Sequence, residues 1–293
     1  MALLTINIVG PGKVGRTLGA LWARTGVFSV GTVLPRTPEG ARAAVAFIGG
    51  GAAVEDMLAM APAAVWMLTT PDDRIAQCAR ALASSGVLRE GNVVFHCSGA
   101  LSSRELEAVA KCGARTASVH PAKSFAEPAA AVASFAGTWC AAEGDEDALA
   151  VLQPAFERIG ARVTRIEAAS KLLYHAANVL ASNYLVALAE AALRAYAAAG
   201  VAREEARAMM APLLRETAEN VLKIGPVQAL TGPIARGDAA LVARQLEALE
   251  KADTALAALY RELGAVAVDL ARARREADLS ALDDIAKTLA RAP

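Results

Sequence analysis

The sequence predicts an α/β fold, a doubly wound and mostly parallel sheet, followed by an all-helical C-terminal domain. In the first half of the chain, short apolar runs rich in β-branched residues alternate with helical patterns, which is the order of a parallel sheet with crossover helices. From Ser170 onward only helical patterns occur. We therefore expect two domains, at residues 1–167 and 168–293.

Each expected strand of the first half ends at a turn signal. Residues 4–9 are apolar and stop at a Gly-Pro-Gly turn, and residues 27–34 stop at Pro35. The same pattern predicts strands at 64–68, 92–95, 116–119, 138–142 and 162–166. Between the strands we expect helices at 13–24, 74–83 and 102–110, with Asp72 or Asp73 capping the second of them.

The second half is predicted to be helical throughout, with a high alanine content that favours helix. The expected helices are 170–199, 202–223, 238–249, 251–272 and 279–291. The most apolar stretch, residues 176–200, contains Glu190 and Arg194. Because charges inside a membrane span are costly, we do not expect a membrane helix here.

Composition excludes several classes of protein. With 293 residues, 55% hydrophobic and 20% charged, the chain has a globular composition. Its formal net charge of +0 argues against a general nucleic-acid binder, which would carry a basic excess. The four cysteines form no C-x-x-C pair, which predicts reduced thiols in a cytoplasmic protein. The chain has no His pair at i, i+4, so we expect no metal site.

A glycine motif follows the first expected strand and opens the first helix. It consists of Gly10, Pro11, Gly12, Lys13, Val14 and Gly15. The first glycine allows a tight turn, the second lets the backbone approach a pyrophosphate, and the third lets the helix pack close to the sheet. The helix N-terminus offers N–H groups to an anion. An ordinary glycine turn is the alternative, but the strand–turn–helix context predicts a Rossmann-like dinucleotide-binding domain.

The end of the second expected strand favours NADP over NAD. NAD-binding proteins usually place an acidic residue there for the ribose 2′-hydroxyl, whereas this chain has Arg36 and Thr37. Arg36 is suited to a 2′-phosphate, although a solvated loop arginine is the alternative. Thr69, Thr70 and Pro71 follow another strand end and should line the nicotinamide side of the cleft.

The three histidines of the chain stand at positions where they could reach this cleft. His96 and His120 come at expected strand ends, and Ser98 follows His96 by two residues. His175 shares one helical stripe with Lys171, Asn178 and Ser182, which are spaced 4, 3 and 4 residues apart. A solvent-facing edge is the alternative, but we expect the stripe to face the cleft, because unpaired polar burial is costly.

These motifs resemble a largely uncharacterised family of Rossmann-like NADP oxidoreductases. The resemblance rests on the glycine motif, residues 118–125, the helix 171–182 and residues 230–238, and it covers nearly the whole chain. It implies a helical C-terminal domain like that of 6-phosphogluconate dehydrogenase. In the related β-hydroxyacid dehydrogenases a lysine opens this helix, as Lys171 does, and an asparagine follows where this chain has His175. The His120-Pro121 pair is similar to one found in prephenate dehydrogenases.

The resemblance implies an NADP-dependent oxidoreductase that moves a hydride between nicotinamide and a small carbonyl or imine substrate, expected to be a carboxylate. Lys171 is the first candidate for the general acid and base, with His175 second. Residues expected to bind substrate are His96, Ser98, His120, Asn178 and Arg236. Alternatives are a sensor or scaffold that binds NADP without turnover, and a deazaflavin-dependent NADP reductase. By analogy, the alanine-rich helical domain suggests a homodimer.

Overall fold

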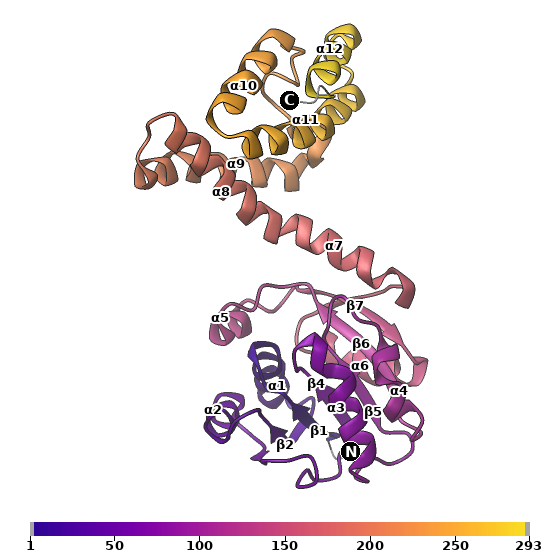
Figure 1. Cartoon of the computed structure of the whole chain (residues 1–293). Coiled ribbons are helices and arrows are strands. Elements are labelled where there is room, and N and C mark those ends of the chain that lie inside the picture. The colour runs from indigo at the N-terminus through magenta and orange to yellow at the C-terminus, as the bar shows by residue number, and fades with distance from the viewer. Residues whose placement is uncertain (1–2, 291–293) are drawn as a thin grey trace. The chain divides into compact units, whose positions relative to one another are not determined.

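The computed structural model describes residues 3–290, without the side chains of Pro38 and Glu39. The chain divides into two compact units, the first ending at Ala181 and the second beginning at Ser182. Figure 1 shows a first unit with a sheet and a second unit made of helices. The division falls one helix later than the boundary expected after residue 167, and the buried side chain of Lys171 is anchored in the first unit.

The first unit holds a single eight-stranded sheet in the order β3-β2-β1-β4-β5-β6-β7-β8. All neighbours pair in parallel except β6 and β7, which confirms the expected mostly parallel sheet. The strands are β1 Thr5–Val9, β2 Ser29–Leu34, β3 Ala52–Ala53, β4 Val65–Leu68, β5 Val93–His96, β6 Arg115–Pro121, β7 Trp139–Gly144 and β8 Arg162–Arg165. The strand order reverses beside β1, which is where doubly wound sheets bind ligands.

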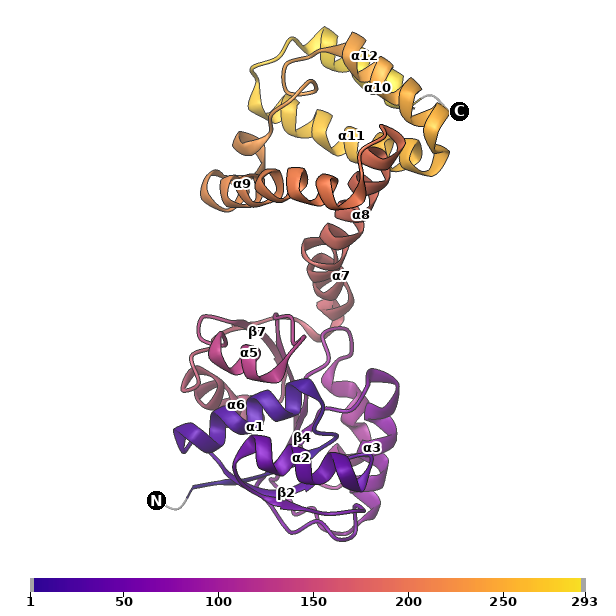
Figure 2. The same cartoon turned by 90° about the vertical axis from the view of Figure 1, so that its left-hand side faces the viewer.

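Helices cover both faces of the sheet, because the central strands are apolar on both sides. In β4, Val65 and Met67 face the core under α1, α2 and α6, whereas Trp66 and Leu68 face the core under α3 and α4. Figure 2 shows α1 and α3 on opposite sides of the strands. The helices are α1 Lys13–Thr25, α2 Pro38–Ile48, α3 Asp72–Ser84, α4 Glu107–Ala110, α5 Pro128–Ala133, α6 Glu146–Glu157 and α7 Lys171–Ala181. Two 3₁₀ turns, η1 Ser103–Leu106 and η2 Ala168–Ser170, precede α4 and α7.

Several local expectations differ from the structure. The helices α2, α5 and α6 were not predicted, although Thr37 caps α2 by accepting the Gly40 N–H at 3.3 Å. The predicted cap of α3 is wrong. Its N-cap is Pro71, and the carboxylate of Asp72 instead accepts a hydrogen bond from Ser98 Oγ at 2.8 Å. Tertiary contact therefore replaces a local cap.

The second unit is all-helical, as predicted. Its helices are α8 Asn183–Ala198, α9 Arg203–Ala229, α10 Ala239–Ala252, α11 Thr254–Arg274 and α12 Leu279–Ala290. The single helix expected over residues 170–199 is interrupted at Ser182, whose φ of −126° and ψ of −66° are not helical. Gly225, with φ of 79°, likewise bends α9. The core of this unit includes Val242, Val268 and Leu282.

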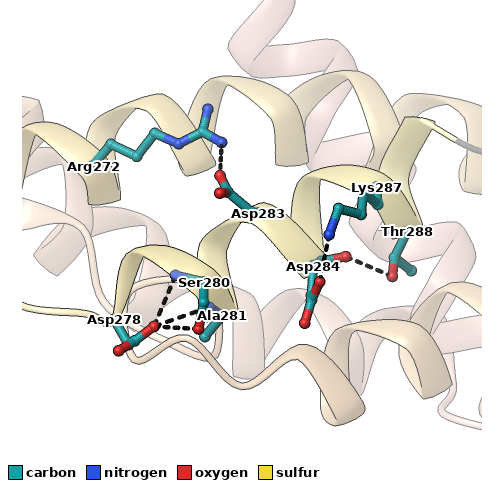
Figure 3. A network of polar contacts seen from close by, with 8 residues as sticks. All are labelled: Arg272, Asp278, Ser280, Ala281, Asp283, Asp284, Lys287 and Thr288. Atoms are coloured by element: carbon teal, nitrogen blue, oxygen red, sulfur yellow. Dashed lines mark hydrogen bonds and ion pairs between the residues drawn. The ribbon is translucent and has the colours of Figure 1, made fainter.

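Polar contacts fasten α12 to α11 (Figure 3). Arg272 Nη2 of α11 donates to Asp283 Oδ1 of α12 at 2.6 Å. The N-terminus of α12 is closed by Asp278, whose carboxylate accepts the Ser280 N–H at 2.7 Å. Such a carboxylate satisfies N–H groups that have no partner within the helix. The C-terminal helix is thus tied at its start and along its side.

Apolar side chains of α7, α8 and α9 remain uncovered in each unit taken by itself. Strongly exposed examples are Leu172, Leu173, Leu180, Val186 and Leu222. The stretch Ala168–Ala198 is long and apolar enough to cross a membrane by length and composition, and 6% of its apolar window is buried. Two of its charged residues are paired within the second unit, since Glu190 binds Arg203 at 2.6 Å and Arg194 binds Asp253.

Candidate functional site

The glycine loop between β1 and α1 has the close contacts that the motif predicts. Gly10 has a φ of 70°, and a Cβ there would stand 2.5 Å from Thr70 Cγ2. A Cβ on Gly15 would collide with the hydroxyl of Thr69. At Gly12 a Cβ would meet only two carbonyl oxygens, both at 3.9 Å. The first and third glycines are thus required by packing, whereas Gly12 is not.

A cavity of about 930 Å³ opens beside this loop. Its lining includes most of the predicted cofactor residues, namely Gly10, Pro11, Gly12, Arg36, Thr37, Thr69, Thr70 and Pro71. Lys13, Val14 and Gly15 stand in the first turn of α1 and are not among the lining residues. The N-terminus of α1 has no side-chain cap, so its N–H groups are available to an anion.

Polar groups around this cavity fit a phosphate-bearing dinucleotide. The buried Thr70 Oγ1 has no hydrogen-bond partner within residues 3–290, which is costly unless a ligand or water binds it. Thr37 Oγ1 accepts from Gly40 and keeps its own proton to donate. Arg36 is exposed at the end of β2. These donors suit the phosphates and ribose of a nicotinamide dinucleotide.

Two further arginines, which the sequence analysis did not single out, line the cavity. Arg16 Nε donates to Pro11 O at 3.0 Å, and Arg74 Nη1 donates to Gln77 Oε1 at 2.8 Å. Their place in the first turns of α1 and α3, directly after strand ends, was the available signal. With Arg36 they give the cavity three guanidinium groups.

Lys171 lies buried at the carboxyl ends of β5 and β6. Its side chain is 1% exposed, and Nζ donates to Ser98 O at 2.7 Å and to Ser118 Oγ at 2.5 Å. Burial lowers the pKa of Lys171 to about 8, against the opposing charge of Glu143. The ammonium therefore keeps its proton at neutral pH and joins the loop after β5 to the middle of β6.

His96 and Ser98 are fully engaged by the protein. His96 Nδ1 accepts the Ser98 N–H at 3.1 Å, and Nε2 lies 3.0 Å from Ser102 O, so Nε2 carries the proton. Burial lowers the pKa of His96 to about 4. Ser98 Oγ donates to Asp72 and accepts the Leu101 N–H at 3.0 Å. A substrate would bind either side chain only by displacing one of these partners, so their substrate-binding role stays a prediction.

His120, Tyr174 and His175 form a second group at the same strand ends. His120 Nδ1 lies 3.1 Å from the Tyr174 hydroxyl, and the His120 and His175 rings are 6.3 Å apart. Burial, followed by the charge of Lys171, lowers the pKa of His120 to about 4. A Cβ on Gly99 would stand 2.5 Å from His175 and 2.9 Å from His120 Nε2, so glycine is needed there.

Only part of the predicted polar stripe on α7 faces these strand ends. Lys171 and His175 contact the β5 and β6 ends, whereas Asn178 Nδ2 donates to the Tyr174 backbone oxygen at 3.0 Å. Tyr174 itself was missed, because the analysis followed the stripe at spacings of 4 and 3 residues. Its position one turn after Lys171 was the signal that could have found it.

Arg236 belongs to the second unit. It precedes Asp238, which caps α10 by accepting the Leu241 N–H at 3.1 Å. The segment thus forms the start of a capped helix, and the expected role of Arg236 toward a substrate stays a prediction. Among the side chains that the structure describes, no three of His, Cys, Asp or Glu gather to hold a metal ion.

The cavity and the Lys171 cluster lie at the same edge of the sheet. Leu68, His96 and Ser118 are aligned across β4, β5 and β6. The loop after β4 lines the cavity, while the ends of β5 and β6 carry the titratable side chains. A nucleotide bound along the glycine loop therefore has acid–base and hydrogen-bonding groups on the neighbouring strands.

Two family models match the sequence, a Rossmann-like domain over residues 1–121 and a domain of unknown function, DUF2520, over residues 138–267. Protein TM1727 from Thermotoga maritima, known from a crystal structure, is 31% identical, with a TM-score of 0.74. The alignment covers 92% of this chain and 100% of that protein. The chain belongs to this Rossmann-like, DUF2520 family. No curated protein matches the sequence.

Two more distant solved structures share the fold of the family. One is described as a "putative NADP oxidoreductase", BF3122 from Bacteroides fragilis, with 20% identity and a TM-score of 0.69 over 94% of this chain and 99% of that one. The other is an imine reductase from Myxococcus stipitatus in complex with NADP⁺, with 14% identity and a TM-score of 0.66 over 96% and 99%. At these identities the likeness concerns the fold.

Proposed function

We propose that the protein is an NADP-dependent oxidoreductase that transfers a hydride between nicotinamide and the carbonyl or imine carbon of a small carboxylate substrate. The observation that carries the proposal is the common sheet edge, where an arginine-lined cavity beside a glycine loop adjoins the cluster of Lys171 and His120. Solved structures of the same fold include proteins described as NADP oxidoreductases and reductases, which supports this class.

The cofactor would lie along the cavity at the ends of β1, β2 and β4. The N-terminus of α1 and the free hydroxyl of Thr70 would hold the pyrophosphate and ribose. Arg36 would pair with the 2′-phosphate, and residues 33–37 contain no acid that would favour NAD. When bound, the cofactor supplies the hydride, and the residues of the chain supply position and protons.

Reduction of a carbonyl adds a hydride to carbon and a proton to oxygen. At neutral pH Lys171 keeps a proton because its pKa is about 8, whereas His96 and His120, with pKa values of about 4, are neutral. Lys171 is therefore the proton source in this proposal. Reduction should slow as pH rises through about 8.

Cofactor binding is tested first, by thermal melts with NADPH, NADH or neither. A ligand at about 100 times its Kd adds roughly 2.7 kcal/mol, which raises Tm by several degrees. A larger shift with NADPH supports the Arg36 assignment. A larger shift with NADH would replace NADP by NAD, and no shift with either would contradict nucleotide binding altogether.

Turnover is tested by NADPH oxidation with glyoxylate, pyruvate, 2-oxoglutarate and cyclic imino acids. Lys171→Ala should abolish turnover and keep the NADPH-induced melting shift. Lys171→Met preserves the volume of the side chain and serves where the alanine variant unfolds. Lys111→Ala is the matched control, because Lys111 is exposed and pairs with Glu107 on the surface. Unchanged turnover in both Lys171 variants would contradict its role.

A non-catalytic NADP sensor is the second candidate. It is favoured by the complete burial of Lys171 and by His175, which stands where the β-hydroxyacid dehydrogenases have asparagine. A sensor would show the NADPH-induced melting shift and oxidise NADPH with none of the substrates. Saturable NADPH oxidation would exclude it.

We further propose that the chain forms a homodimer in the cytoplasm, with no nucleic-acid or membrane partner. The exposed leucines and valine of α7, α8 and α9 support a dimer, because uncovered apolar surface of this kind marks interfaces. Light scattering coupled to size-exclusion chromatography tests it, and a mass near the monomer value of 30.1 kDa would contradict it.

A further inference from the structure

The contact between His120 and Tyr174 joins two segments far apart in the sequence. His120 is the penultimate residue of β6, and Tyr174 lies in the first turn of α7. The imidazole Nδ1 and the phenol oxygen are 3.1 Å apart, and the rings meet edge to face at 5.6 Å. Either atom could carry the shared proton, so the chemistry of the pair decides which nitrogen of His120 is protonated.

The surroundings favour the phenol as donor. Burial raises the pKa of Tyr174, so the phenol keeps its proton. A side-chain hydrogen bond with Asn178 lowers this pKa, which is the effect of a donor to the phenol oxygen. The hydroxyl proton is then left for His120 Nδ1. The imidazole is neutral, because burial and the nearby charge of Lys171 oppose its protonation. A neutral ring that accepts at Nδ1 carries its proton on Nε2.

The Nε2 side of His120 faces Gly99. A Cβ on Gly99 would stand 2.9 Å from this nitrogen and 2.5 Å from His175, so glycine is what allows the two imidazoles to pack this closely against the backbone. Nε2 makes no hydrogen bond to any residue in the range 3–290, in contrast to both nitrogens of His96. A directed N–H donor without a protein partner is available to a substrate oxygen or nitrogen.

We propose that Tyr174 is a positioning residue that fixes His120 as the neutral Nε2–H tautomer, so that His120 offers a hydrogen bond to the reacting carbonyl or imine. The proposal rests on the proposed oxidoreductase function for the identity of the acceptor. The tautomer itself is a property of the free protein. No electron or proton leaves His120, which polarises the acceptor by its hydrogen bond while Lys171 remains the proton source.

The test is long-range ¹H–¹⁵N correlation NMR of the full-length ¹⁵N-labelled protein at pH 7. The chain has three histidines, and single His→Asn variants assign them. In the wild type we expect Nδ1 of His120 to be unprotonated and Nε2 to be protonated. His96 is the internal reference, because its Ser98 and Ser102 partners set the same tautomer without tyrosine. Tyr174→Phe should convert His120 to a mixture of tautomers and leave His96 unchanged.

Tyr184→Phe is the matched control, since it removes the same hydroxyl from an exposed tyrosine and should change neither histidine. A protonated Nδ1 on His120 in the wild type would overturn the proposal, even if Tyr174→Phe failed to fold. An unchanged His120 tautomer in a folded Tyr174→Phe variant would do the same. Where turnover is measurable, Tyr174→Phe should lower kcat roughly tenfold to a hundredfold and leave the KM for NADPH unchanged.

The tautomer proposal and the proposed oxidoreductase function can be refuted independently of each other. Loss of the NADPH-induced melting shift, or absence of NADPH oxidation with every substrate, counts against the oxidoreductase and leaves the tautomer pattern intact. A wrong tautomer with normal NADPH oxidation counts against Tyr174 alone.

Discussion

Acid should destabilise the first unit through His96. The side chain is 0% exposed, Nδ1 accepts the Ser98 N–H and Nε2 donates to Ser102 O. Protonating Nδ1 would remove that acceptor and place a charge in a buried site. Burial accordingly lowers the pKa of His96 from 6.5 to about 4.

The sign and size of the effect follow from this shift. The unfolded chain takes up the proton first as pH falls below 6.5, so stability is fully present above that pH and is lost toward pH 4. Between pH 7 and pH 5 the loss due to His96 is about 2 kcal/mol, and it approaches roughly 3 kcal/mol below pH 4. His120 adds a loss of the same direction.

The assay compares urea unfolding of the wild type and His96→Asn at pH 7 and pH 5. Tryptophan fluorescence reports on the first unit, because Trp22, Trp66 and Trp139 all belong to it and the first two are buried. Asparagine keeps an acceptor for Ser98 N–H but does not titrate, and contributions from carboxylates and His120 cancel in the difference. We expect the variant to be less stable at pH 7 and to lose about 2 kcal/mol less on acidification. Equal losses of unfolding free energy in both proteins would refute the inference that His96 is buried and neutral.

Three further outcomes are expected. Arg36→Ala should weaken NADPH binding by roughly tenfold to a hundredfold and leave NADH unchanged, as measured by calorimetric titration, since one charge-assisted hydrogen bond is lost; equal losses for both nucleotides would argue against the 2′-phosphate contact. Gly15→Ala should lower stability by about 1–3 kcal/mol in urea unfolding, because its Cβ would displace the hydroxyl of Thr69. Gly99→Ala should cost a similar amount and shift the His120 and His175 signals in NMR, whereas an unperturbed spectrum would show that the space beside Gly99 is larger than the structure indicates.

Much of the fold could be predicted because its signals are local. The alternation of apolar runs and helical patterns gave the parallel sheet, and strand–glycine–helix order placed the cofactor cavity at the ends of β1, β2 and β4. The strand β7 was predicted but its antiparallel direction was not, since period-two patterns do not carry strand direction. The break at Ser182 was also missed, because an alanine-rich stretch has no strong local stop signal.

The chemical environment of the site was decided by tertiary structure. The sequence alone identified Lys171, His96 and His120 as chemistry-bearing residues, but it could not show that Lys171 would be 1% exposed or that His96 would have both nitrogens occupied. It also passed over Tyr174. Burial and pairing depend on contacts between residues 54 to 73 positions apart, such as His120 with Tyr174 and Ser98 with Lys171. Local patterns set which elements form, whereas desolvation at a shared sheet edge sets which of their polar groups can act.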